Sequence, residues 1–78
     1  MEKIETATLL GFIVVWYYER GFGFIRNEAT RERFYAHIKS FVPKESPNVG
    51  DRVEFTVKSR REGKYRSVES AMIVDGGR

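Results

Sequence analysis

Two stretches of the chain alternate strictly between apolar and polar side chains, and this alternation constrains the fold more than any other feature. The stretches are residues 32–38 and 50–58. Their apolar positions are Phe34, Ala36 and Ile38 in the first, and Val53, Phe55 and Val57 in the second. Because successive side chains of a strand point to opposite sides, a period of two predicts strands with one buried and one solvated face.

The other segments are also short, rich in β-branched and aromatic residues, and separated by turn residues. We expect strands at residues 8–18, 22–27, 32–38, 50–58 and 64–74, with turns or loops at 27–31, 42–48 and 59–63. A helix around residues 35–42 is the competing local prediction, although a short helical turn after Ile38 is compatible with five strands. This pattern predicts an all-β barrel or sandwich.

The length and composition limit the class of protein. The 78 residues form one domain, which we expect to have its core between about residues 8 and 74 and frayed termini. The absence of cysteine excludes disulfides, thiolate metal sites and cysteine nucleophiles, and it fits a reducing compartment. The longest apolar run, residues 9–18, is about half of a membrane helix. We expect a cytoplasmic monomer without membrane contact.

The second expected strand, residues 22–27, allows two arrangements. Phe22 and Phe24 share one face, and phenylalanine is usually buried, so this face is one candidate for the core. The opposite face carries Gly23 and Ile25. We favour this second face as the inner one, because Arg26 lies on the phenylalanine face and because inner glycines allow a small barrel to curve tightly.

The first expected strand has apolar residues on both faces, so alternation does not assign it. Trp16 and Tyr18 share one face, and Tyr17 lies on the other. Trp16 and Tyr18 either extend an outer aromatic surface, or Trp16 anchors the core. Both alternatives stay open at this point.

The outer residues of the second and third expected strands combine rings with cations. Tyr35 and His37 lie opposite the apolar face of residues 32–38, and in an antiparallel pair they would join Phe22 and Phe24. The flanking cations are Arg20, Arg26, Arg33 and Lys39, in a chain with a net charge of +3. Nucleobases stack on aromatic rings, and cations attract phosphates, so this surface predicts binding of single-stranded nucleic acid.

Four segments resemble the cold-shock domain family. Residues 20–25, RGFGFI, are similar to its first ribonucleoprotein motif, commonly KGFGFI, and residues 34–41, FYAHIKSF, resemble the second motif. Residues 11–20 and 49–57 resemble its first and fourth strands. The resemblance implies a five-stranded antiparallel OB-fold barrel that binds single-stranded RNA and DNA on its first three strands.

The resemblance also implies residue roles. Phe22, Phe24 and Tyr35 match stacking positions, while Trp16 matches the family's tryptophan or the phenylalanine after it. The residues that we expect to contact nucleic acid are Trp16, Tyr18, Arg20, Phe22, Phe24, Arg26, Tyr35, His37, Lys39 and Arg66. Ile38 stands where the family has a ring, and the fifth-strand motif GPQA is replaced by GKYRS, which makes Lys64, Tyr65 and Arg66 candidates for new contacts.

These features predict a passive binding domain, such as an RNA chaperone or a cold-shock-type regulator. The alternative is a small barrel that docks another protein on the same aromatic face. We expect no enzymatic activity, and the only candidate acid–base pair is His37 as a general base with Asp51 or Glu54 as the orienting acid. The sequence has no P-loop, no dinucleotide fingerprint and no metal-ligand spacing, so we expect no cofactor and no metal.

Overall fold

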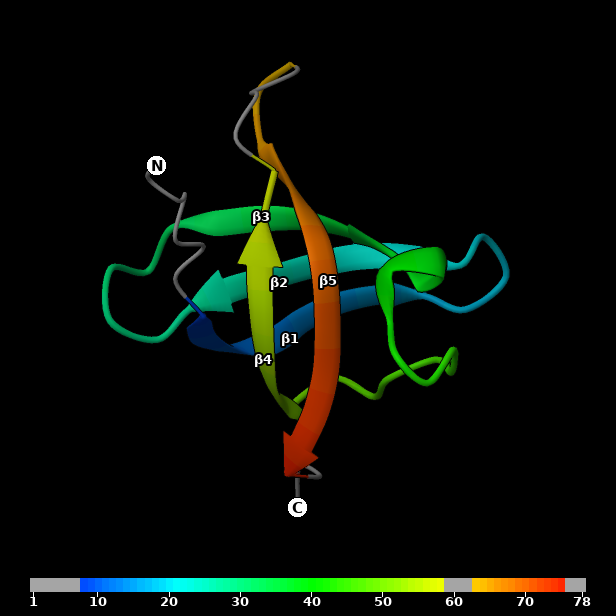
Figure 1. Ribbon diagram of the computed structural model, residues 1–78. Coiled ribbons are helices and arrows are strands. Elements are labelled where there is room, and N and C mark those ends of the chain that lie inside the picture. Colours follow the sequence, from blue (N-terminus) through cyan, green and yellow to red (C-terminus); the bar gives the residue numbers. More distant parts are fainter. Residues whose placement is uncertain (1–7, 59–62, 76–78) are drawn as a thin grey trace, which may run out of the picture.

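The computed structural model describes residues 8–58 and 63–75, so the expected frayed termini and most of the charged turn at 59–63 lie outside the described residues. Figure 1 shows five strands and one short 3₁₀ helix. The elements are β1 (Leu9–Tyr17), β2 (Phe22–Asn27), β3 (Arg33–His37), η1 (Ile38–Ser40), β4 (Arg52–Val57) and β5 (Arg66–Asp75). The five expected strands are confirmed to within two residues at each end, and η1 is the short helical turn that was compatible with them.

The strands close into a barrel in the order β1-β2-β3-β5-β4, which confirms the expected OB-fold architecture. Four neighbouring pairs are antiparallel, as expected, and β3 and β5 form one parallel pair. The reason is topological. Directions cannot alternate all the way around a ring with an odd number of strands, so one pair must be parallel.

The core is made of the residues that alternation placed inside. Phe34 and Ala36 of β3 and Val53 and Phe55 of β4 are each at most 2% exposed. The arrangement of β2 is also settled, because Ile25 is fully buried and Gly23 is buried, while the two phenylalanines are half-buried on the outer face. The remaining buried apolar residues are Ile13, Trp16, Phe41, Val68 and Ala71.

A bulge explains why alternation did not assign β1. The register against β2 shifts between Ile13 and Val15, so Val14 is an extra residue in the ladder. An extra residue reverses the faces that follow it. Ile13 and Trp16 therefore both point inward, and Tyr17 points outward with an exposed fraction of 48%. Of the two alternatives for Trp16, the structure has the one in which Trp16 anchors the core.

A glycine is required at position 23, where β2 pairs closely with β1. It pairs with Trp16, and a Cβ atom at this position would collide with the carbonyl oxygen of Val15 and lie 2.6 Å from Trp16 Cε3. The strands approach so closely only because residue 23 has no side chain. The glycine therefore holds Trp16 in the core and leaves the outer face to its two neighbours in sequence, Phe22 and Phe24.

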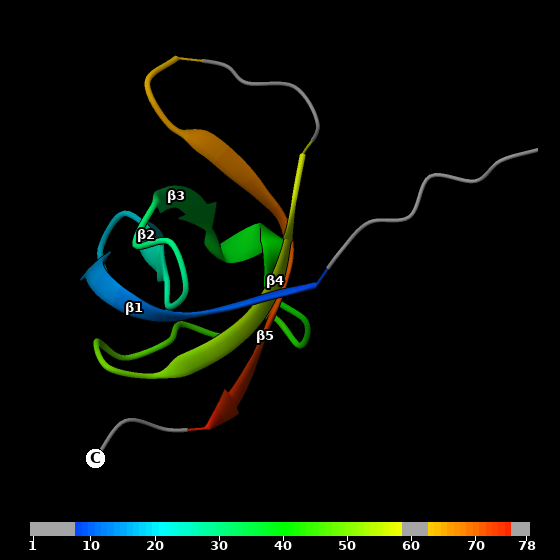
Figure 2. The same cartoon turned by 90° about the vertical axis from the view of Figure 1, so that its left-hand side faces the viewer.

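The start of β5 lies beside the start of β3, and the segment before it extends past β3 in the views of Figures 1 and 2. Arg66 pairs with Phe34, and Ser67 pairs with Tyr35, in the parallel register. This register places residue 65 level with Arg33, the first residue of β3. This segment comes next to the outer face of β2 and β3.

Candidate nucleic-acid interface

The outer face of β1, β2 and β3 brings its aromatic residues into register. Phe22 pairs with His37 across β2 and β3, and Phe24 pairs with Tyr35. Tyr17 of β1 pairs with Phe22 from the other side. Directly opposite side chains on one face of a sheet lie close enough to touch, so the register alone gathers these rings into one surface.

Five rings on this surface form a continuous series, which we call the aromatic row. In order, they are Tyr17, Phe22, Tyr35, Phe24 and Tyr65. The centroid distances between successive rings are 5.1, 5.5, 6.1 and 5.0 Å. These lie in the range of favourable aromatic contacts. The rings therefore hold one another in place and present a pre-formed surface on which flat ligands can stack.

His37 extends the aromatic row beside Phe22, and its orientation is fixed. Its Nδ1 accepts a hydrogen bond from the backbone N–H of Lys39 at 3.1 Å, as the N-cap of η1. A nitrogen that accepts carries no proton, so the neutral ring has its proton on Nε2. The cap thus fixes the half-buried imidazole of His37 at the end of β3, and its other nitrogen can donate a hydrogen bond.

Cations surround the aromatic row without carboxylate partners among the described residues. Arg20, Arg26, Arg33 and Lys39 are exposed, and no ion pair involves them in the part of the chain that the structure describes. Arg26 pairs directly with Arg33 across β2 and β3. Like charges in directly opposite positions are destabilising. This cost is understandable where an anionic ligand approaches the surface.

Of the ten residues expected to contact nucleic acid, the structure brings seven to this face. They are Arg20, Phe22, Phe24, Arg26, Tyr35, His37 and Lys39. Arg66 pairs instead with the buried Phe34, so it lies on the core-facing side of the sheet. Arg20 lies in the turn between β1 and β2, and Arg66 begins β5 beside β3.

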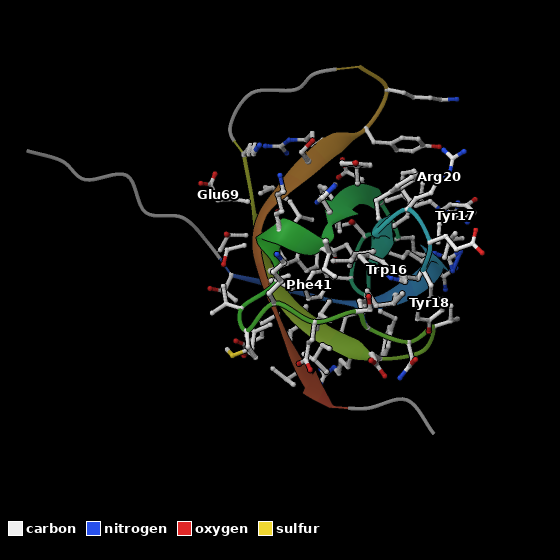
Figure 3. The ribbon with its side chains drawn as sticks, turned by 90° about the vertical axis from the view of Figure 1, so that its right-hand side faces the viewer. Trp16, Tyr17, Tyr18, Arg20, Phe41 and Glu69 are labelled. Atoms are coloured by element: carbon white, nitrogen blue, oxygen red, sulfur yellow. The ribbon has the colours of Figure 1, made fainter. Side chains whose placement is uncertain are left out.

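Trp16 and Tyr18 are placed elsewhere. Trp16 is 6% exposed and packs edge-on against Phe41 with ring centroids 5.6 Å apart, so its indole offers no open face to a base. Tyr18 is 55% exposed, but its hydroxyl donates a hydrogen bond to Asn48 Oδ1 at 2.7 Å, in the loop before β4. In Figure 3, Tyr17 lies toward Arg20, whereas Tyr18 lies lower, beyond Trp16. Trp16 and Tyr18 are therefore not members of the row of ring contacts.

Two members of the aromatic row were missing from the expected set, Tyr17 and Tyr65. Tyr17 faces outward only because of the bulge in β1, and nothing in the alternation of residues 8–18 indicates where such a bulge falls. Tyr65 had a visible signal. The replacement of the family's fifth-strand motif by GKYRS puts a ring between two cations, and it was named only as a candidate for a new contact.

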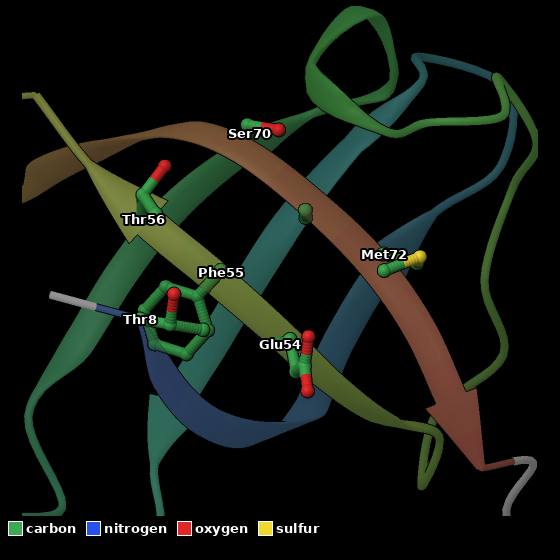
Figure 4. Close-up of a pocket in the computed structure, with 7 residues that line it drawn as sticks. Thr8, Glu54, Phe55, Thr56, Ser70 and Met72 are labelled. Atoms are coloured by element: carbon green, nitrogen blue, oxygen red, sulfur yellow. The ribbon is translucent and has the colours of Figure 1, made fainter. Parts of the chain in front are cut away.

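The described residues do not bring together the acid–base pair of His37 with Asp51 or Glu54 that an enzyme would need. Asp51 is 4% exposed, and its Oδ2 accepts a hydrogen bond from the backbone N–H of Asn48 at 2.8 Å, which is a structural role in a loop. Glu54 lines a different pocket, of about 170 Å³, between β4 and β5 (Figure 4). Residues 8–58 and 63–75 contain no cluster of histidine and carboxylate ligands for a metal, and none of their helices is long and apolar enough to cross a membrane.

The comparison with protein families agrees with this geometry. Residues 10–69 of the chain match the family described as the 'Cold-shock' DNA-binding domain. The match covers more than half of the chain, and the chain belongs to this family. No curated protein matches it at a significant level. Membership implies binding of single-stranded nucleic acid by a domain that is not an enzyme.

Proposed function

We propose that this domain binds single-stranded RNA or DNA on the aromatic row and acts as an RNA chaperone or a cold-shock-type regulator. The observation that carries the proposal is the uninterrupted series of ring contacts from Tyr17 to Tyr65, with centroids 5.0 to 6.1 Å apart. Bases have two flat faces, and each base stacked on a ring contributes about 1–3 kcal/mol. Several rings in one row make a single strand the ligand of matching shape.

The surrounding cations supply the second part of the interaction. Arg20, Arg26, Arg33 and Lys39 are exposed and have no carboxylate partners among the described residues. Each phosphate that such a cation neutralises releases condensed counterions, which makes binding dependent on salt and independent of sequence. The expected partner is thus any accessible single strand, with modest sequence preference from the stacking.

A chaperone or regulatory role follows from passive binding. A protein that binds the open form of an RNA, and not its base-paired form, shifts the equilibrium toward the open form by mass action. This needs no nucleotide hydrolysis, in keeping with the absence of a P-loop in the sequence. We expect the domain to act in this way as a monomer in the cytoplasm.

Fluorescence anisotropy of a labelled oligo-dT or oligo-U tests the proposal. The double variant Phe22→Ala/Phe24→Ala should lose about 2–6 kcal/mol of binding free energy, because two stacking rings are removed. Met72→Ala is the matched control, since Met72 is an exposed apolar side chain of β5 that lies outside the aromatic row. Unchanged affinity of the double variant would contradict the proposal.

A hairpin labelled with a fluorophore and a quencher tests the chaperone role. The wild-type domain should open the hairpin at protein concentrations near its affinity for the open strand, and added salt should raise the concentration needed. Binding without any opening would limit the function to single-strand binding. A salt-insensitive complex with another protein that survives nuclease treatment would instead favour the protein-docking alternative.

A further inference from the structure

The aromatic row does not end at the edge of the three-stranded face. Its last ring, Tyr65, comes from the segment before β5, while the other four rings come from β1, β2 and β3. The tyrosine ring lies 5.0 Å from the ring of Phe24. The row therefore continues from the sheet onto a separate segment.

The ring planes show what Tyr65 does for a ligand on Phe24. Tyr65 is inclined by 62° to Phe24, and Tyr35 is inclined by 73° on a centroid distance of 6.1 Å. Neither neighbour stacks flat on Phe24. A base that stacks on Phe24 would meet two inclined rings as its flanks. These three residues thus form an arrangement of one central ring between two inclined rings, which we call the Phe24 cradle.

Cations also lie at this end of the aromatic row. The Nζ atom of Lys64 lies 5.8 Å from the centroid of Tyr65, a distance typical of a cation–π contact. Arg26 pairs with Arg33 on the same face as Phe24 and Tyr35. These three cations have no carboxylate partner within the described part of the chain.

We propose that Tyr65 and Lys64 form an additional nucleotide subsite with Phe24, in which Tyr65 flanks the base on Phe24 and Lys64 binds the adjoining phosphate. This inference rests on the proposed function, since it assigns one end of the strand that the aromatic row binds. The subsite gives the base on Phe24 a second aromatic contact that the rings of β1, β2 and β3 do not supply. It is built from the segment in which this chain departs from its family's pattern, GKYRS in place of GPQA.

A length series of oligo-dT measures this subsite directly. Anisotropy titrations with labelled strands of increasing length should show affinity that rises until the aromatic row is filled. Tyr65→Ala should bind the long strands about tenfold more weakly, which corresponds to about 1.4 kcal/mol and lies within the range for one stacked base. The loss should appear only with strands that are long enough to place a base on Phe24. Tyr65→Phe keeps the ring and should bind like the wild type.

The charge contribution has its own readout. Lys64→Ala should reduce the slope of log affinity against log salt by about 0.7, the value for one phosphate contact on a single strand. Lys44→Ala is the charge-matched control, because Lys44 is an exposed lysine in the loop before β4 and lies outside the segment of Tyr65. The control should keep the wild-type slope. Thermal unfolding of each variant confirms that it is folded at the temperature of the titration.

Different failures of these experiments have different meanings. If Tyr65→Ala binds every length as tightly as the wild type, or more tightly, while Phe24→Ala binds weakly, the additional subsite is overturned and the proposed function stands. Tighter binding would show that Tyr65 covers Phe24 as a lid. If the wild type binds no single strand, or if Phe22→Ala and Phe24→Ala change nothing, the proposed function fails, and this inference fails with it.

Discussion

The two outer sides of this barrel differ in what they expose. The side formed by β1, β2 and β3 carries most of the aromatic row and a set of cations without ion pairs among the described residues. Across β4 and β5 the only aromatic residue is Phe55, which is 1% exposed.

The β4 and β5 side also has a charged side chain that is paired with an opposite charge. The guanidinium of Arg52 makes two hydrogen bonds to the carboxylate of Glu28, at 3.0 and 3.3 Å. Thr56 and Ser70 line the shallow pocket of Figure 4. This side also exposes Met72 and Val74 of β5, at 46% and 42%, but none of its described residues exposes a ring.

The difference bears on which side would bind the proposed ligand. Clustered exposed rings favour association, and opposite like charges such as Arg26 and Arg33 cost stability. A chain that needed only to fold would gain nothing from either feature. Local departures from good folding chemistry concentrate at functional sites, and here they concentrate on one side of the barrel.

The largest expected effect separates Trp16 from the rings of the aromatic row. Trp16→Ala removes a side chain that is 6% exposed from the core of a 78-residue domain, so the free energy of unfolding should fall by about 3–5 kcal/mol. Chemical denaturation followed by circular dichroism measures this loss. A variant that stays as stable as the wild type but binds oligo-dT weakly would show that Trp16 stacks on bases, against its placement here.

The next effect concerns the close pairing of β1 and β2 at Gly23, beneath the aromatic row. Gly23→Ala introduces a methyl group against the carbonyl oxygen of Val15 and the ring of Trp16. Such overpacking should cost about 1–3 kcal/mol of unfolding free energy. For a domain of this size, this corresponds to a fall in Tm of very roughly 4–24 °C.

A matched control for Gly23→Ala is Gly63→Ala. A Cβ atom at residue 63 would meet nothing within 4 Å, and its only penalty is the positive φ of +82°. Gly63→Ala should therefore destabilise by about 1 kcal/mol, the scale of a left-handed non-glycine residue. If the two variants have the same Tm, the close approach of β1 and β2 at Gly23 adds no cost to the new methyl group.

The sequence was sufficient for the parts of the fold that follow a period of two. Phe34, Ala36, Val53 and Phe55 alternate without interruption, and burial follows the alternation. The placement of Trp16 was not predictable in this way, because one extra residue at Val14 exchanges the two faces of β1 for the rest of the strand. The energy of a bulge depends on the neighbouring strands, and no property of residues 8–18 reports it.

The candidate site divides along the same line. The rings of β2 and β3 were predicted on the outer face, from the alternation of residues 32–38 and from Arg26 and the glycines of residues 22–27. Tyr17 was not assigned, because its orientation depends on the bulge. Tyr65 was named only as a candidate, because its contact with Phe24 depends on the parallel pairing of β3 and β5. Contacts between segments far apart in sequence are set by closure of the barrel, which no local pattern encodes.

The smallest expected effect makes binding and stability change in opposite directions. Arg33→Gln removes one of two like charges in directly opposite positions of β2 and β3. The free energy of unfolding should rise by about 0.2–1 kcal/mol, the scale of cross-strand pairs. Affinity for oligo-dT should fall, and the slope of log affinity against log salt should decrease by about 0.7, because one phosphate contact is lost.

Lys44→Gln is the control for Arg33→Gln, since it removes the same charge from an exposed position outside the aromatic row. It should leave both the stability and the salt slope close to those of the wild type. If Arg33→Gln lowers stability instead, Arg33 is held by folded-state contacts, and the repulsion is not a cost accepted for binding. If Arg33→Gln raises stability and leaves the salt slope unchanged, Arg33 does not contact phosphate. Only the combination of higher stability and weaker, less salt-dependent binding supports a side of the barrel shaped by an anionic ligand.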